Sequence, residues 1–155
     1  MRLLRTVVAL AVLLGAVVGL AGCSPASPIG LRKDGDRLVV VLGRQCVPAS
    51  HLTKLRLRNM DEERNESIDP PLWEIEAQQA RAVPEVVVGT VPDGYAETAN
   101  NIASQGIKKR VALSVSFGDS TYATTLDTSK IKDGKILDAS GKLLSEDEFR
   151  KQYGC

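Results

Sequence analysis

Alternation of apolar and polar residues predicts short β-strands along most of this chain. Apolar side chains at every second position are typical of a strand that buries one face and exposes the other. The clearest case is residues 110–117, which place Val111, Leu113, Val115 and Phe117 on one face and Arg110, Ala112, Ser114 and Ser116 on the other. A turn at Gly118-Asp119 leads into residues 121–126, and the two segments together predict a β-hairpin.

Two earlier segments alternate in the same way. Residues 52–57 and the positions beside them place Lys54, Arg56 and Arg58 on a solvent face. Residues 72–77 place Trp73, Ile75 and Ala77 toward the core, with Glu74 and Glu76 outside. Each pattern predicts a half-buried strand.

Other segments carry weaker signals. Residues 37–42 begin with Arg37 and continue as an unbroken apolar run, which is typical of a central strand, and residues 84–90 form a further β-branched strand. Residues 130–137 predict a short strand or hairpin around Asp133-Gly134. Residues 96–109 are compatible with one helical turn or with a long loop.

The C-terminal residues predict a short helix. Ser145 is a good N-cap, and Glu148 three positions later completes a capping box. Leu144 and Phe149 have the spacing of a hydrophobic staple, and Phe149 and Tyr153 share one helix face. The chain as a whole therefore predicts an antiparallel β-sandwich of about six to seven strands, immunoglobulin-like or fibronectin-like, with Trp73 in its core and a helix at its end.

The first 22 residues have the three parts of a secretory signal peptide. Arg2 and Arg5 precede an apolar run, and small residues follow it. The stretch Leu20-Ala21-Gly22-Cys23 resembles the lipobox of bacterial lipoproteins. That resemblance implies cleavage before Cys23 and a diacylglyceryl group on its thiol. Two alternatives are an uncleaved transmembrane helix, since ~20 apolar residues can cross a bilayer, and secretion with a free Cys23.

The lipobox implies an organisation and a location. Residues 1–22 are expected to be a cleaved signal peptide, 23–35 a lipidated N-terminus with a flexible tether, and 36–155 a single domain. This pattern is similar to the small β-sandwich domains of bacterial surface lipoproteins. It implies residence at the extracytoplasmic face of the bacterial cell membrane, held there by the lipid.

Composition excludes one class of partner. Removing Arg2 and Arg5 from the 20 basic residues leaves 18 against 19 acidic ones, so the mature chain is almost neutral. A nucleic-acid-binding protein would be strongly basic, so we expect no nucleic-acid partner. With six aromatic residues, the core has to consist mainly of Val, Leu and Ile.

Cys46 and Cys155 remain once Cys23 is assigned to the lipid. Disulfides persist in the oxidising compartments to which exported proteins go, so we expect these two residues to form a bridge. The alternative is a pair of free thiols that bind metal. Two cysteines and one histidine, His51, do not provide a typical zinc site.

Few residues suggest chemistry. His51 is adjacent to Ser50, but neighbours on a strand point to opposite faces, so we expect a strand-end role for His51. The pair Glu74 and Glu76 has the residue types of a glycosidase, although spacing alone does not indicate one. An acidic loop is a possible calcium site that lacks the spacing of an EF-hand, and it contains Asp61, Glu62, Glu63, Glu66 and Asp69. The sequence predicts no catalytic residue, no metal site and no cofactor.

Recognition is the function that the sequence favours. Lys54, Arg56 and Arg58 form a possible contact face for an acidic partner or for anionic headgroups. The alternative is an ordinary outer face, paired across the sheet with Glu74 and Glu76. Loops at residues 59–71 and 93–109 are further contact candidates.

We therefore expect a non-enzymatic binding or accessory module. Its partners would be the membrane, through the lipid anchor, and an envelope protein or cell-wall component. The alternative is an envelope hydrolase or a small-ligand carrier whose site the sequence does not reveal.

Overall fold

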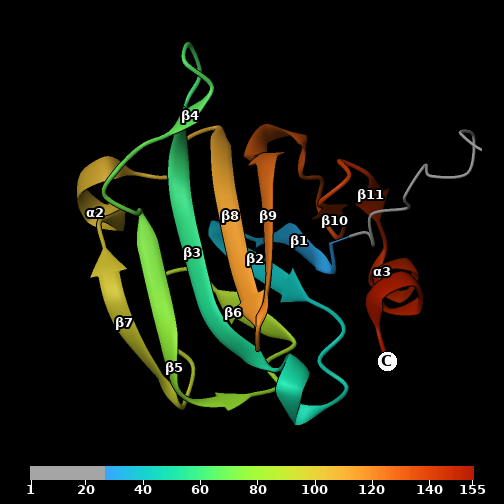
Figure 1. Cartoon of the computed structure of the whole chain (residues 1–155). Coiled ribbons are helices and arrows are strands. Elements are labelled where there is room, and N and C mark those ends of the chain that lie inside the picture. Colours follow the sequence, from blue (N-terminus) through green and yellow to red (C-terminus); the bar gives the residue numbers. More distant parts are fainter. Residues whose placement is uncertain (1–26) are drawn as a thin grey trace, which may run out of the picture.

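Two antiparallel β-sheets pack against each other in the computed structural model, which describes residues 27–155 (Figure 1). A short C-terminal helix packs against one of them, the five-stranded sheet. The predicted antiparallel β-sandwich with a C-terminal helix is thereby confirmed. The expected signal peptide and Cys23 lie outside the described residues.

The six-stranded sheet contains the central strands of the fold. Its order is β7-β5-β3-β8-β9, and β4 pairs with the end of β3. The bounds are β3 (Leu52–Asp61), β4 (Glu66–Ser67), β5 (Trp73–Arg81), β7 (Tyr95–Asn100), β8 (Arg110–Phe117) and β9 (Ser120–Asp127). The predicted hairpin of residues 110–126 is confirmed as β8 and β9, paired from Arg110 opposite Asp127 to Phe117 opposite Ser120.

The five-stranded sheet has the order β11-β10-β1-β2-β6. Its strands are β1 (Ile29–Asp34), β2 (Arg37–Leu42), β6 (Glu85–Val87), β10 (Ile136–Asp138) and β11 (Leu143–Leu144). Short helical segments connect the strands, namely η1 (Pro48–Ser50), α2 (Ile102–Gln105) and η2 (Thr128–Lys130), and α3 (Glu146–Tyr153) follows β11. The eleven strands within residues 27–155 exceed the six to seven expected, partly because several have only two or three residues.

The expected tether at residues 23–35 is wrong from Ile29 onward. Residues 29–34 form β1, which pairs along its whole length with β2 and on its other side with β10. Ile29 and Leu31 are completely buried. The domain therefore begins at Ile29, before the expected position 36.

Residues 95–105 contain both a strand and a helical turn. β7 pairs with β5 at one edge of the six-stranded sheet, and α2 follows after Asn101. The expected contact loop at 93–109 is thus shorter than predicted, because its first half belongs to the sheet.

The inner faces of the two sheets form the main core. Alternating residues of β3 and β8, such as Leu55, Leu57, Leu113 and Val115, are almost fully buried there. Trp73 is also completely buried, as predicted, and its Nε1 donates a hydrogen bond of 2.6 Å to Glu97 Oε1. The indole thus has a partner for its polar atom, as a buried tryptophan usually does.

Helix α3 covers the outer face of the five-stranded sheet. Phe149 and Tyr153, which the sequence places on one face, pack with Val41 and Ile136 in a second small core. This contact explains the unbroken apolar run of β2, since both faces of that strand are buried. Gly43 allows the close approach, because a Cβ there would lie 2.3 Å from the Tyr153 carbonyl oxygen.

The helix begins as the sequence predicts. Ser145 Oγ accepts a hydrogen bond from the Glu148 backbone N–H, and Glu148 Oε2 accepts one from the Ser145 N–H. Leu144 packs against the small core that contains Phe149, so the staple pair lies together.

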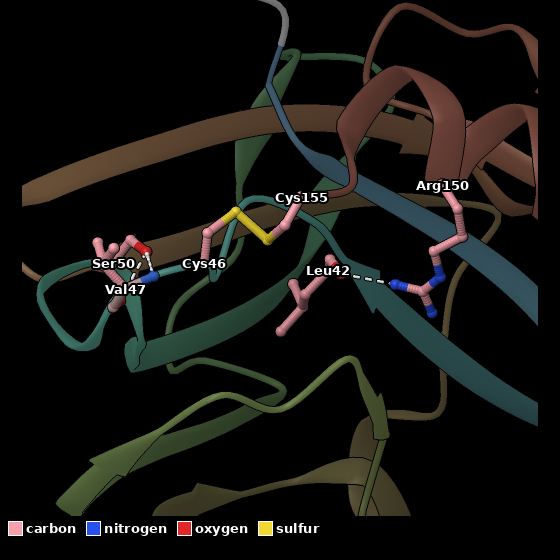
Figure 2. Close-up of a disulfide and its surroundings, with 6 residues drawn as sticks. All are labelled: Leu42, Cys46, Val47, Ser50, Arg150 and Cys155. Carbon is pink, nitrogen blue, oxygen red and sulfur yellow. Dashed lines mark hydrogen bonds between the residues drawn. A yellow bond between two sulfur atoms is a disulfide. The ribbon is translucent and has the colours of Figure 1, made fainter.

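A disulfide between Cys46 and Cys155 attaches the end of the chain to the segment after β2 (Figure 2). The two Cα atoms lie 5.5 Å apart. Arg150 on α3 adds a hydrogen bond of 3.1 Å from Nη1 to the Leu42 carbonyl oxygen (Figure 2). The predicted cysteine pairing is confirmed, and it holds the end of α3 close to the five-stranded sheet.

Trp73→Ala is expected to lower the free energy of unfolding by about 3–5 kcal/mol, because the substitution leaves a large cavity in the main core. Denaturant unfolding followed by circular dichroism measures the change. The control is Val47→Ala, because Val47 is 54% exposed and its truncation should change the value by no more than about 0.5 kcal/mol. A Trp73 effect as small as the Val47 effect would contradict the assignment of the indole to the core.

Cys46→Ser is expected to lower the free energy of unfolding by about 2–5 kcal/mol, since the bridge closes a loop with a sequence separation of 109. Thermal unfolding with and without reductant measures this contribution. Reductant should destabilise the native chain and leave the Cys46→Ser variant unchanged. Equal sensitivity of both proteins to reductant would contradict a structural role for the bridge.

Candidate functional site

The outer face of the six-stranded sheet is open among the described residues. Helix α3 covers the corresponding face of the other sheet, whereas no element of residues 27–155 lies over β5, β3, β8 and β9 (Figure 1). Because of the strand alternation, this face carries Lys54, Arg56 and Arg58 from β3. The predicted contact face is therefore on a side of the molecule that a ligand can reach.

Lys54 and Arg56 are paired with acidic residues of the neighbouring strand. Lys54 lies opposite Glu76 and Arg56 opposite Glu74 in the β3–β5 register. Lys54 Nζ is 3.1 Å from Glu74 Oε1 and 3.5 Å from Glu76 Oε2, and Arg56 Nε donates to Glu74 Oε2. Cross-strand pairing, the alternative that the sequence left open, is therefore present along this half of the face.

These ion pairs form a charge ladder of Lys54, Arg56, Glu74 and Glu76, and Glu74 is its centre. Its side chain is 10% exposed, and this burial by itself raises the carboxyl pKa. Hydrogen bonds from Arg56, Lys54 and Thr98 outweigh the burial and lower the pKa from 4.5 to about 2. A carboxylate held ionised in this way is a poor proton donor, so Glu74 does not have the character of a glycosidase acid.

A groove of about 450 Å³ lies next to the ladder, over β8 and β9. It exists because the outward side chains of these two strands are short, with Ala112 opposite Thr125 and Ser114 opposite Ala123. The long side chains of Arg56 and Arg58 line it on the β3 side. Ser67 of β4 also lines the groove, so the loop predicted at 59–71 contributes to it.

The two arginines keep donor groups that no residue of the described part of the chain uses. Arg58 Nη2 is 3.1 Å from Asp69 Oδ1, while Arg58 Nε is buried and has no hydrogen-bond partner within residues 27–155. Arg56 uses its Nε for Glu74. In the part of the chain that the structure describes, its two Nη atoms form no hydrogen bond.

Three of the hydroxyl groups that line the groove are also unused, whereas Thr124 Oγ1 donates to the Ala139 carbonyl oxygen at 3.2 Å. Ser67, Ser114 and Thr125 make no side-chain hydrogen bond to any residue from 27 to 155. Farther along the same strands, outside the groove, Ser116 Oγ and Thr121 Oγ1 lie 2.9 Å apart and bind each other. Free donors and acceptors thus gather where the surface is hollowed.

The two predicted contact loops meet at one end of the sandwich. Buried Asn59 donates from Nδ2 to the Gly106 carbonyl oxygen at 2.9 Å and accepts from the Lys108 N–H at 2.9 Å. Asn101 Nδ2 donates to the Pro71 carbonyl oxygen at 2.8 Å. Residues 59–71 and 101–108 are therefore side by side, near β4 and α2 in Figure 1.

The other residues that the sequence suggested for chemistry lie next to a strand or make hydrogen bonds within the fold. His51 lies immediately before β3, and its neighbour Ser50 donates its hydroxyl to the Val47 carbonyl oxygen at 2.8 Å. In the acidic loop, Asp61 Oδ1 accepts from the backbone N–H groups of Glu63 and Arg64. Among residues 27–155, no three His, Cys, Asp or Glu side chains are grouped in a way that could hold a metal ion.

The groove itself is a feature that sequence reasoning missed. The alternation in residues 110–117 shows that small side chains point outward from β8, and residues 121–125 show the same for β9. Once a hairpin of these two strands is predicted, their small outward side chains can be expected to lie next to each other. The position of Arg56 and Arg58 beside them depends on the long-range pairing of β3 with β8.

Comparison of the chain with protein-family models, with curated proteins and with solved structures gives no match. Within the described residues, no helix has both the length and the apolar character needed to cross a membrane.

Glu74→Gln is expected to lower the free energy of unfolding by about 1–3 kcal/mol at pH 7, because it leaves Arg56 and Lys54 without a buried anionic partner. The folded-state pKa of Glu74 is depressed, so its stabilisation is complete above the ordinary pKa of 4.5 and is lost as the pH falls toward about 2. The native and variant proteins should therefore become similar in stability over this range. Urea unfolding at several pH values between 7 and 2.5 measures the difference.

The matched control for this experiment is Glu76→Gln, because Glu76 is 56% exposed on the same strand face. Its effect at pH 7 should be small, as for most exposed ion pairs. A stability difference for Glu74→Gln that stays constant from pH 7 to 2.5 would contradict the pKa assignment.

Proposed function

We propose that this protein is a non-enzymatic binding module, attached by lipid to the extracytoplasmic face of a bacterial cell membrane. Its contact surface is the outer face of the six-stranded sheet. The observation that carries the proposal is the groove beside Arg56 and Arg58, on the one sheet face that no described element covers.

The anchor is argued from the first 23 residues. A charged start, an apolar run and the stretch Leu20-Ala21-Gly22-Cys23 have the form of a lipoprotein signal. A diacylglyceryl group has two acyl chains, and two chains hold a protein stably at a membrane where one does not. The folded domain then needs no membrane-binding surface of its own.

The tether in this arrangement is short. Cys23 precedes Pro28 by five residues, which can span at most about 18 Å. The Pro28 carbonyl oxygen already accepts a hydrogen bond of 2.8 Å from the Gly43 N–H, so the fold begins there. The chain enters the domain through β1 of the five-stranded sheet, whereas the groove lies on the outer face of the opposite sheet. The anchor therefore leaves the contact surface free.

A binding role also agrees with the state of the polar side chains. Glu74 is neutralised by two cations, and the Ser50 hydroxyl is bound to a backbone carbonyl. The unused groups on this surface are arginine nitrogens and aliphatic hydroxyls, which bind ligands well and are weak acids and bases near pH 7. Such a set favours recognition over proton transfer.

Cys23→Ala is expected to abolish lipidation, because it removes the thiol that carries the diacylglyceryl group, and a labelled fatty acid fed to the cells should mark the native protein and not the variant. Mass spectrometry of the native chain should show an acyl mass on a protein that starts at Cys23. A native chain with an intact leader, or with an unmodified thiol at position 23, would contradict the anchor.

The contact surface is tested in living cells that produce the protein with a photo-reactive amino acid at a chosen position. Placed at Ala123 in the groove, it should form an adduct with an envelope component under illumination. The matched position is Asp36, an exposed residue in the turn between β1 and β2, and it should form no such adduct. Equal adducts from both positions would contradict the assignment of the contact surface.

A further inference from the structure

The geometry of the groove points to a ligand class, and we propose that it binds an acidic saccharide, a sugar unit that carries a carboxylate or a phosphate group. This inference rests on the proposed binding function and specifies its ligand. The oxyanion is bound by Arg58 with help from Arg56, and the sugar ring lies over β8 and β9.

Arg58 has a free place for an oxyanion. Nε and Nη2 lie on the same edge of a guanidinium group, which can bind the two oxygens of a carboxylate or phosphate together. Asp69 occupies this edge through one oxygen on Nη2, and Nε, which is buried in this arrangement, has no partner among the described residues, so an oxyanion can take this edge only when the Asp69 side chain moves. The Asp69 side chain is 74% exposed, so an incoming oxyanion can displace it into solvent.

The charges around the groove favour an anion. Its charged lining residues are Arg56 and Arg58. The acidic neighbours Glu74 and Glu76 lie on β5, on the far side of β3, and Glu74 is already compensated by Arg56 and Lys54. Apart from the displaceable Asp69, no carboxylate of the described residues contacts Arg58.

The rest of the groove fits a sugar ring. The hydroxyls of Ser67, Ser114 and Thr125 can each donate and accept, as the hydroxyls of a sugar require. The methyl groups of Ala112 and Ala123 offer apolar contacts for the C–H groups of the ring. The volume of about 450 Å³ lies within the range of small-molecule sites.

The same surface suits a peptide less well. An extended peptide usually adds to the edge of a sheet, where free backbone groups bind its main chain. The groove lies over the faces of β8 and β9, and β8 is paired on both sides, with β3 and with β9. β9 is the edge strand, but its free backbone groups lie along the edge of the sheet and not on the face that carries the groove, so side chains provide the recognition there.

The test is an NMR titration of the full-length mature chain in detergent micelles, followed through the Nε–Hε signal of Arg58. The probes are glucuronate and glucose 1-phosphate, which carry the two types of oxyanion on a similar ring. Both should shift this signal and the Ala112 and Ala123 methyl signals in a saturable way. Glucose, acetate and inorganic phosphate, tested separately, should each bind at least about tenfold more weakly, because each lacks half of the recognised groups.

Variants identify the residues responsible. Arg58→Gln should weaken glucuronate binding about tenfold or more, as expected for the loss of a charge-assisted hydrogen-bond pair. Asp69→Asn should strengthen it severalfold, because the competing carboxylate is removed. The control is Arg37→Gln, since Arg37 is exposed on the five-stranded sheet, and it should leave the affinity unchanged.

Three results would overturn the proposal. The first is that neither sugar acid gives a saturable shift at Arg58. The second is that acetate or phosphate binds as tightly as the matching sugar acid. The third is that an acidic peptide binds more tightly at the same residues. Failure of the anchor is read separately, from the mass of the native N-terminus. If the protein carries the lipid but does not bind sugar acids, the proposed ligand class is wrong and the proposed location is not affected.

Discussion

The pairing of β3 with β8 is the interaction on which the rest of the structure depends. The two strands run antiparallel from Leu52 opposite Phe117 to Asn59 opposite Val111, in the middle of the six-stranded sheet. Because side chains alternate along a strand, this register places Leu55 and Val115 in the core and, at the same time, Arg56 beside Ser114 outside. A shift by one residue would bury the arginines and expose the leucines. Stability and the composition of the groove are thus set by the same register.

The two sheets use their outer faces differently. On the five-stranded sheet, Phe149 and Tyr153 of α3 cover Val41 and Ile136, and the Cys46–Cys155 bridge holds the end of the helix in place. On the six-stranded sheet, charge pairs and short hydroxyl side chains make the outer face compatible with water. That face therefore needs no cover, and a ligand can reach it without any rearrangement of the fold.

Much of the fold could be predicted from local patterns. The alternation of residues 110–117 and the capping box at Ser145 identify β8 and α3, because each depends on nearby residues alone. β1 was missed because its second half, with Lys33 and Asp34, is polar, and its burial comes from β2 and β10. For the site, the sequence identified the arginines and their acidic partners. It did not reveal the groove, whose shape depends on how β3, β8 and β9 adjoin, nor that Arg58 Nε has no hydrogen-bond partner among residues 27–155.

The central claim is that ligands bind on the bare face of the six-stranded sheet and not on the loops at its end. The most direct measurement is of intermolecular nuclear Overhauser effects between bound glucuronate and the methyl groups of the full-length mature protein. The account predicts contacts from the sugar protons to the Ala112, Ala123 and Thr125 methyls, which line the groove. Contacts confined to the loop around residues 101–108, such as the exposed Ile107 methyls, would contradict it.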